Sequence, residues 1–353
     1  MRTVGGQHRG VAVLAATALG LATLTAGERT TARLEESLYA PGSPLTVAAA
    51  GASPQTQQTL VRTRPLYTAP GSAAAVALAK TPRSQTSTRA LLTKIAGQPQ
   101  AVWLGDWLTP AKARSQATTL VKAAKKANKL LPVVLYNIPF RDCHGYSAGG
   151  AKSDTAYRAW IDQVAAGLAG GRVVAVLEPD ALPHLDCLTT TRQAARLALL
   201  RYAVTRLTNT SGVAVYLDAG HSAFKPAETM AARLEQAGID RAAGFALNVA
   251  NFRATADEIA YGRQVSALAD DAHFVVDVSR NGNGPWTGTQ SWCNPPGRAL
   301  GARPTTSTRD PLLDATLWIK TIGLSDGACR TGAPKAGVWW QSYALGLASR
   351  ARW

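Results

Sequence analysis

Short apolar segments alternate with helix-prone segments along most of this chain, and this alternation constrains the fold more than any other feature. The apolar segments are nearly continuous, as expected of strands that are covered on both faces of a sheet. Strands that alternate with helices form parallel sheets. The expected strands occupy residues 101–107, 131–139, 173–180, 213–220, 244–251, 273–280 and 314–320. The expected helices occupy residues 110–129, 154–168, 189–209, 226–237, 255–269 and 339–349.

Seven strands in this pattern predict a parallel α/β barrel rather than a sandwich. One barrel can use all 353 residues, and the chain has neither an internal repeat nor a Ser/Pro-rich linker. We therefore expect a single domain over residues 65–353, with a short helix within residues 80–100. Residues 27–64 are rich in Ala, Thr, Ser and Pro without a sustained period, which predicts a poorly ordered N-terminal arm.

The first 26 residues have the composition of a secretory signal peptide. The basic segment MRTVGGQHRG precedes the apolar segment VAVLAATALGLATLTA, and small residues follow where cleavage would occur. The apolar segment is short for a membrane span, so we expect a secreted protein, with an uncleaved N-terminal anchor as the alternative. No other segment is apolar for long enough to cross a bilayer.

The four cysteines are even in number, which predicts two disulfides in an exported chain. Their spacing leaves all three pairings open. Neither the CxxC nor the HxxxH spacing of a zinc site is present, so no metal is expected. The cysteines are Cys143, Cys187, Cys293 and Cys329.

The net charge of +16 is typical of proteins that bind nucleic acid or an anionic surface. The densest basic cluster, however, falls on the expected solvent face of the helix over residues 110–129, and no nucleic-acid-binding signature is present. The segment NGNGPWTG at residues 281–288 is not a GxGxxG nucleotide motif, and no GxSxG nucleophile motif exists. We expect neither a nucleic-acid partner nor a cofactor. The basic cluster comprises Lys122, Lys125, Lys126 and Lys129.

Four of the apolar segments end on, or just before, an aspartate. An ionised carboxylate at the end of a buried strand is costly unless the protein uses it there. In folds where strands alternate with helices, the C-terminal ends of the strands line the functional face. This pattern indicates an enzyme with several carboxylates facing one cleft, although any single aspartate could instead be a loop cap or an ion-pair partner. The four are Asp142, Asp180, Asp218 and Asp277.

Aromatic and amide side chains recur at the starts of the same loops. Any one of these aromatic residues is better explained as part of the core, but their recurrence beside carboxylates suits a sugar chain, whose rings stack while its hydroxyls hydrogen-bond. The aromatic residues are Trp103, Trp107, Tyr136, Tyr146, Phe224, Trp286 and Trp292, and the amides are Asn248 and Asn251.

Cleavage of a glycosidic bond requires one carboxyl group that is protonated near neutral pH and a second that activates water or acts as a nucleophile. Asp180 follows an apolar strand and lies between Pro179 and Pro183, which makes it the best candidate for the acid. Burial and a nearby Asp142 carboxylate would both raise the pKa of Asp180.

Several motifs together resemble the cellulases of glycoside hydrolase family 6, over roughly residues 65–350. These motifs are YNIPFRDCHGYSAGG (136–150), VLEPDAL (176–182), YLDAGHSAF (216–224), NVANF (248–252), VSRNGNGP (278–285), WCNPPGRALG (292–301) and the pair LWIK and SDG within 317–327. The resemblance implies a distorted, seven-stranded, TIM-like barrel that hydrolyses β-1,4-glucan with inversion, and we expect a monomer. Inversion implies that the acid and base carboxyl groups lie about 6.5–9.5 Å apart.

The resemblance also implies roles for individual residues. Asp180 corresponds to the general acid, Asp142 to an aspartate that raises the pKa of the acid and organises water, and Asp326 to the candidate base. Asp277 has no such counterpart and is expected to be structural. The implied disulfides are Cys143–Cys187 and Cys293–Cys329. The implied substrate-binding residues are Trp103, Asp106, Tyr136, Asp218, His221, Asn248, Trp292 and Lys320.

Two positions depart from the family pattern. Leu324 stands where the family usually has a glutamate, so a sugar-contacting carboxylate is missing beside Asp326. Phe140 replaces a small or polar residue and could crowd the loop that carries Asp142. Either change could reduce the rate or alter the substrate preference.

Loop length indicates the mode of action. The two loops that roof the cleft of exo-acting members are short here, with only HGYSA between Cys143 and Gly149 and only two residues between Asp326 and Cys329. An open cleft favours an endoglucanase. A cellobiohydrolase and a catalytically weakened glucan-binding protein remain the alternatives.

Overall fold

The seven strands form one curled and fully parallel sheet in the computed structural model, which describes residues 51–353. The strands follow one another across the sheet in chain order, which confirms the distorted seven-stranded parallel barrel. They are β1 (Val102–Gly105), β2 (Leu131–Tyr136), β3 (Val173–Leu177), β4 (Val213–Asp218), β5 (Gly244–Leu247), β6 (His273–Asp277) and β7 (Leu313–Leu317). No ladder joins the edge strands β1 and β7; instead, the Ala101 N–H donates to the Trp318 carbonyl at 2.9 Å.

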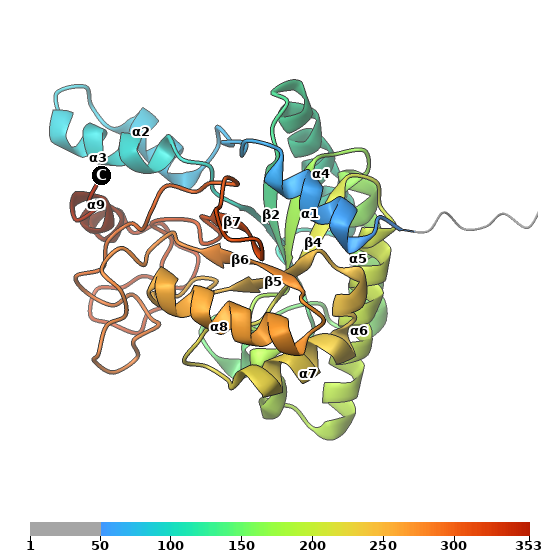
Figure 1. Cartoon of the computed structure of the whole chain (residues 1–353). Helices are drawn as coiled ribbons and strands as arrows, with labels where there is room; N and C mark the ends of the chain where they lie inside the picture. Colours follow the sequence, from blue (N-terminus) through green and yellow to red (C-terminus); the bar gives the residue numbers. More distant parts are fainter. Residues whose placement is uncertain (1–50) are drawn as a thin grey trace, which may run out of the picture. The chain divides into compact units, whose positions relative to one another are not determined.

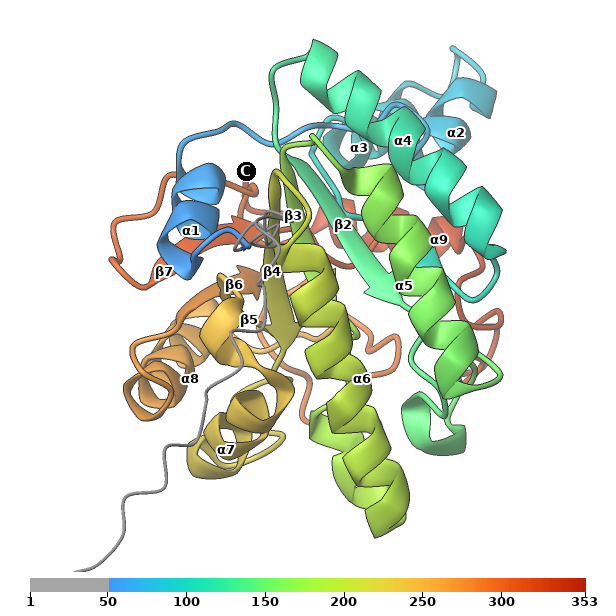
Figure 2. The same cartoon turned by 90° about the vertical axis from the view of Figure 1, so that its right-hand side faces the viewer.

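From α4 to α8, the helices pack along the outer side of the sheet, with neighbours in sequence lying side by side (Figures 1 and 2). Each of α4, α5 and α6 begins with a Ser or Thr N-cap that accepts a backbone N–H, and α4 also has a proline in its first turn. The helices after β1 are α4 (Pro110–Lys126), α5 (Asp154–Leu168), α6 (Thr190–Thr208), α7 (Ala227–Ala237), α8 (Thr255–Leu268) and α9 (Gln341–Ser349). Short 3₁₀ helices are η1 (Asp142–His144), η2 (Pro183–Cys187) and η3 (Ile239–Arg241). Within residues 51–353, no helix is long and apolar enough to cross a membrane.

The strands are buried on both faces, so two hydrophobic cores result. In β2, Val133 and Leu135 join the core beneath the outer helices, whereas Val134 joins the core inside the barrel. This alternation explains why the strands read as continuous apolar segments in the sequence.

Several strands end earlier than expected because the chain turns sharply after them. Glu178 and Asp180 after β3, and Asn248 and Ala250 after β5, all have positive φ angles, between 51° and 68°. Left-handed backbone cannot continue a strand. Asp180 therefore lies on a loop, as does Asp142, which begins η1, whereas Asp218 and Asp277 are the last residues of β4 and β6.

The expected arm over residues 27–64 contains a helix that the sequence pattern did not indicate, α1 (Pro54–Arg62). The Gln57 amide donates to the Arg241 carbonyl at 2.8 Å and accepts the Val215 N–H at 3.1 Å, so α1 is docked against the barrel. The short helix expected within 80–100 is α3 (Thr86–Ala96), and an unexpected helix, α2 (Ala73–Lys80), precedes it. The predicted signal peptide and the rest of the arm up to residue 50 lie outside the described residues.

Candidate active site

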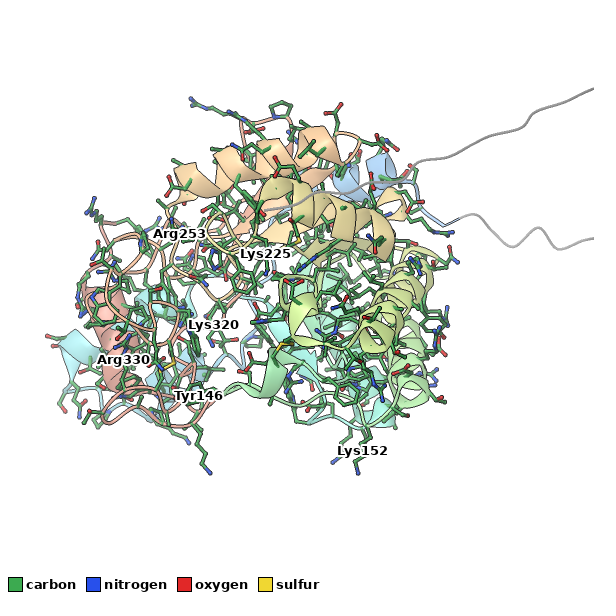
Figure 3. All side chains as sticks on the ribbon, turned by 90° about the horizontal axis from the view of Figure 1, so that it is seen from below. Tyr146, Lys152, Lys225, Arg253, Lys320 and Arg330 are labelled. Atoms are coloured by element: carbon green, nitrogen blue, oxygen red, sulfur yellow. A yellow bond between two sulfur atoms is a disulfide. The ribbon has the colours of Figure 1, made fainter. Side chains whose placement is uncertain are left out.

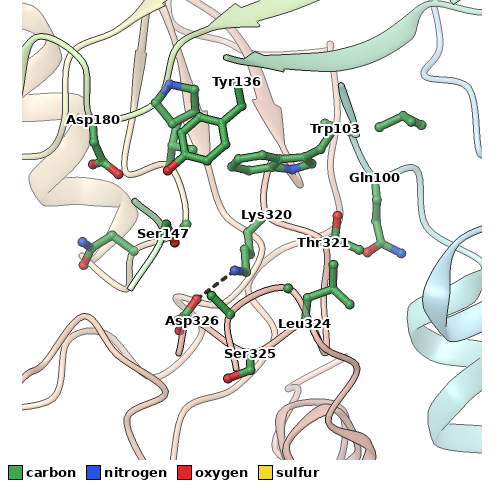
Figure 4. Close-up of a pocket in the computed structure, with 18 of the residues that line it drawn as sticks. Gln100, Trp103, Tyr136, Ser147, Asp180, Lys320, Thr321, Leu324, Ser325 and Asp326 are labelled. Atoms are coloured by element: carbon green, nitrogen blue, oxygen red, sulfur yellow. Dashed lines mark ion pairs between the residues drawn. The ribbon is translucent and has the colours of Figure 1, made fainter. Parts of the chain in front are cut away.

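A cavity of about 1600 Å³ lies among the loops that follow the strands, and it contains most of the residues predicted from the sequence (Figure 4). Carboxylates, one lysine and several aromatic rings line it together. Predicted residues that line it are Trp103, Tyr136, Asp142, Asp180, His221, Trp292, Lys320 and Asp326. The strand ends thus gather chemically active side chains at one face of the barrel.

Asp180 lies on the loop after β3, with a left-handed φ of 68°. Its backbone N–H donates to Asp218 at 2.8 Å, which fixes the loop to the end of β4. Burial raises the pKa of Asp180 to about 6, with the Asp142 carboxylate adding to the rise and His184 and Lys320 opposing it. A carboxyl group with this pKa remains partly protonated in mildly acidic solution and can act as a general acid.

Asp142 also has a left-handed backbone, with φ 58°, and its carboxylate accepts the Ser147 N–H at 2.6 Å. The next residue, Cys143, forms a disulfide with Cys187 at the end of η2, with the Cα atoms 6.0 Å apart. This bridge links the loop of Asp142 to the loop of Asp180. A second disulfide joins Cys293 to Cys329, and together the two confirm the pairing implied by the resemblance.

Trp103 and Tyr136 form one aromatic wall of the cavity. Their rings meet edge to face with centroids 5.1 Å apart, and the Trp103 indole N–H donates to the Ile319 carbonyl at 2.9 Å. The Arg141 guanidinium lies 4.1 Å from the Tyr136 ring centroid and pairs with Asp106 at 3.1 Å. These contacts hold both rings in place before any ligand binds.

Asp326 is held by two cations. One Arg280 nitrogen donates to both oxygens of the carboxylate, at 3.0 and 2.8 Å, and the Lys320 ammonium lies 2.8 Å from Oδ1. Burial opposes ionisation, but Arg280 and Lys320 together keep the pKa of Asp326 below its usual value. A carboxylate in this environment is a weak proton acceptor.

His221 is uncharged in this environment, because burial lowers its pKa to about 4, with Arg253 contributing. The Ala223 N–H donates to Nδ1 at 3.2 Å, so Nε2 carries the ring proton. His221 therefore presents a neutral donor beside Phe224, whose ring centroid lies 5.3 Å from its own.

Three residues predicted to bind substrate do not line the cavity: Asp106, Asp218 and Asn248. Asp106 binds the Arg141 side chain and the Gly150 N–H, and Asp218 binds the backbone of Asp180 and Gly220. The Asn248 side chain bonds backbone groups of Asp277 and Arg253. These contacts shape the loops around the cavity, and substrate binding by the three residues stays a prediction.

Asp277 is structural, as the sequence suggested. Its carboxylate is 1% exposed and accepts N–H groups from Ala250, Ser279, Ile319 and Lys320 at 2.9–3.2 Å. Asp277 therefore fixes the backbone of Lys320, whose ammonium group lies in the cavity.

The two short loops do not leave the cleft entirely uncovered. The Tyr146 ring, on the loop after β2, lies with its centroid 5.9 Å from that of Trp292, on the loop between β6 and β7. Seen from below, Tyr146, Lys320 and Arg253 lie around the opening of the cavity (Figure 3). Tyr146 also packs against Gly327, on the segment after β7, so one side chain bridges the cleft here.

The two unusual positions differ in their environment. Leu324 lines the cavity near Lys320 and Thr321 (Figure 4), so a carboxylate at this position would lie in the cleft. Phe140 does not line the cavity; it is 48% exposed and its ring lies 4.5 Å from the Arg192 guanidinium. The ring packs against α6 and does not crowd the Asp142 loop, so the predicted crowding is wrong.

Sequence reasoning missed Arg141 and Arg280, which are 8% and 1% exposed and bind the acidic groups around the cavity. Arg141 follows a predicted strand and Arg280 is the last residue of one, within the motifs FRDC and VSRN. A basic residue next to an apolar strand and an aspartate was a signal for a buried ion pair.

Comparisons with known proteins agree on one family. The model of the family described as Glycosyl hydrolases family 6 matches residues 61–351. The chain is 46% identical over 266 residues to Endoglucanase A of Cellulomonas fimi, an alignment that covers 75% of this chain and 57% of that protein. It is 35% identical over 326 aligned positions to 1,4-beta-D-glucan cellobiohydrolase C of Emericella nidulans, covering 73% of this chain and 70% of that protein.

A solved structure is similar in both sequence and fold. It is the endoglucanase Cel6 from Mycobacterium tuberculosis in complex with methyl-cellobiosyl-4-deoxy-4-thio-β-D-cellobioside. The TM-score is 0.79 at 45% sequence identity, over 82% of this chain and 98% of that chain.

Proposed function

The chain belongs to glycosyl hydrolase family 6, and from this premise we propose that it is an inverting endo-β-1,4-glucanase acting on cellulose-type glucans. The observation that carries the proposal is the pairing of Asp180, with its pKa raised to about 6, and Asp142 in a cavity lined by aromatic rings. We also propose that the protein is exported and monomeric, since two disulfides suit an oxidising compartment.

In the proposed mechanism, protonated Asp180 donates its proton to the glycosidic oxygen as the bond breaks, while water attacks the opposite face of the sugar ring. The Asp142 carboxylate keeps Asp180 protonated, organises the attacking water and accepts its proton through a second water molecule, so the step leaves Asp180 ionised and Asp142 protonated. The ion pairs of Asp326 argue against its role as the proton acceptor. We propose instead that Asp326 holds Lys320 in position to bind sugar hydroxyls.

Two observations favour internal cleavage over a cellobiohydrolase. The identity to an endoglucanase is 46%, against 35% for a cellobiohydrolase. The segments between Cys143 and Gly149 and between Asp326 and Cys329 are short, and Tyr146 makes the contacts that cross the cleft, to Trp292 and Gly327. A chain interior can enter from the side once Tyr146 moves.

The viscosity of soluble carboxymethylcellulose, measured together with new reducing ends, tests this proposal. An endoglucanase lowers viscosity quickly with few new reducing ends, whereas a cellobiohydrolase lowers it slowly. A glucan-binding protein without activity would change neither quantity and would contradict the proposal. Polarimetry of the products of a cellooligosaccharide would test inversion.

We expect activity to fall as pH rises through about 6, because the general acid must be protonated and the pKa of Asp180 is about 6. Asp142→Asn removes the carboxylate that raises this pKa, so the decline should move to lower pH in the variant. The measurement is kcat against pH at saturating substrate. An unchanged decline in Asp142→Asn would contradict the coupling of the two residues.

Replacing Leu324 with glutamate is expected to raise kcat/KM by up to about tenfold, since a hydrogen bond to a charged group contributes roughly 1.5 kcal/mol. Leu324 lines the cavity, where the new carboxylate would accept sugar hydroxyls. Leu324→Gln is the matched control for polarity without charge. No gain, or a loss, with Leu324→Glu would show that Leu324 does not limit this enzyme.

A further inference from the structure

Behind the cavity, two buried and ionisable side chains join the loops that carry Asp142 and Asp180. Glu178 is fully buried two residues before Asp180, and Arg196, which is 2% exposed, projects from α6. Neither lines the cavity. Their function must therefore be exerted through the residues that they bind.

The Glu178 carboxylate binds the backbone at the start of the loop after β2. Its carboxylate accepts the Asn137 N–H at 2.9 and 3.0 Å and the Ile138 N–H at 2.8 Å. Its backbone has a φ of 51°, which departs from the extended path of β3. Glu178, at the start of the Asp180 loop, thus holds Asn137 and Ile138, which lead to Asp142.

Arg196 binds the same two loops from the helix side. Its guanidinium donates to the Pro139 and Phe140 carbonyls at 3.0 and 2.7 Å, and to the Ala181 carbonyl at 3.2 Å. Phe140 precedes Asp142 by two residues, and Ala181 directly follows Asp180. One side chain therefore connects the backbones on which both carboxyl groups depend.

This arrangement is costly if it serves stability alone. Burial raises the pKa of Glu178 to about 7 and lowers the pKa of Arg196 below its usual value. Well-packed apolar residues often stabilise a core as well as buried charged groups do. What apolar residues cannot do is bind five backbone groups at fixed positions.

We propose that Glu178 and Arg196 are positioning residues that fix the spacing between the Asp142 and Asp180 carboxyl groups. This inference rests on the proposed function of that pair. Besides Arg196, the ionisable groups that face Glu178 are Tyr136, Arg141 and Tyr157. Those that face Asp180 are Tyr136, Asp142, His184, Asp218 and Lys320.

The test compares Arg196→Met and Glu178→Leu with the conservative variants Arg196→Lys and Glu178→Gln. We expect the first two to lower kcat by at least about tenfold with KM changed less than about threefold, since misplacing catalytic groups by 1 Å can cost about 100-fold. Because Asp142 would raise the pKa of Asp180 less, the decline of kcat at high pH should move down by roughly half a pH unit. Glu178→Gln keeps one acceptor oxygen and should lie between wild type and Glu178→Leu.

Asp314→Asn is the matched control. Asp314 is equally buried but lies at the start of β7, where it binds Tyr216 at 2.6 Å and His273 at 2.8 Å. It should lower Tm without moving the pH profile. The positioning role is refuted if the Glu178 and Arg196 variants lose kcat only in proportion to their loss of Tm, with the pH profile of kcat unchanged. It is also refuted if only the conservative variants fold and their kcat and pH profile match those of wild type. Failure of the proposed function would appear separately, as wild-type protein that does not cleave glucan.

Discussion

Asp180→Asn is expected to lower kcat on a soluble β-1,4-glucan by about 10²–10⁴-fold, the usual contribution of a general acid. Asparagine has nearly the same shape but cannot donate a proton to the leaving oxygen. The backbone N–H of residue 180 would keep its bond to Asp218, so the loop should stay in place. Initial rates from new reducing ends give the loss, and calorimetry with a cellooligosaccharide should show binding within a few-fold of wild type.

The control for this substitution is Asp186→Asn. Asp186 lies on η2 close to Asp180 in sequence, but its side chain is 54% exposed and pairs with Lys225. Its loss should leave kcat nearly unchanged. If Asp180→Asn retained more than about a tenth of the wild-type rate, the proton donor would have to be another residue.

Arg280→Met is expected to lower the free energy of unfolding by about 3–5 kcal/mol, because it leaves a buried charge without its main partner. Arg280 is 1% exposed and donates to both oxygens of Asp326. For a domain of this size, such a loss lowers Tm by on the order of 10 °C. kcat should also fall, since Asp326 would no longer hold Lys320 as firmly.

Arg263→Met provides the matched comparison. Arg263 pairs with Asp310 at 2.8 Å, but its side chain is 60% exposed, and exposed ion pairs contribute less than about 1 kcal/mol. Thermal unfolding of both variants, followed by circular dichroism, measures the difference. Equal Tm losses would contradict the view that burial makes the Arg280–Asp326 pair important.

Local patterns in the sequence were sufficient for the number, order and direction of the strands. Continuous apolar segments such as residues 173–177 and 213–218 are typical of strands covered on both faces, and the helices between them favour parallel pairing. The same patterns placed Asp180 and Asp142 near strand ends, and the motifs around them implied the disulfides that the structure contains. Helix α1 was missed because its docking depends on Gln57 and Gln58, whose partners lie far away in sequence.

The aspartates show where the sequence was insufficient. Asp142, Asp180, Asp218 and Asp277 follow similar apolar segments, yet only the first two line the cavity. Left-handed backbone at Asp142 and Asp180 brings their side chains into the cleft, whereas Asp277 is surrounded by backbone N–H groups. Backbone turns of this kind depend on neighbouring loops that sequence spacing does not describe.

The sequence by itself determined the parallel barrel and the face on which its chemistry lies, because strand burial and strand direction follow from local periodicity. Only the tertiary structure decided how each carboxyl group behaves. The pKa of Asp180 rises through burial beside Asp142, while the pKa of Asp326 falls beside Arg280 and Lys320. These effects act between charges from different strands over a few ångströms, and such distances exist only after the chain has folded.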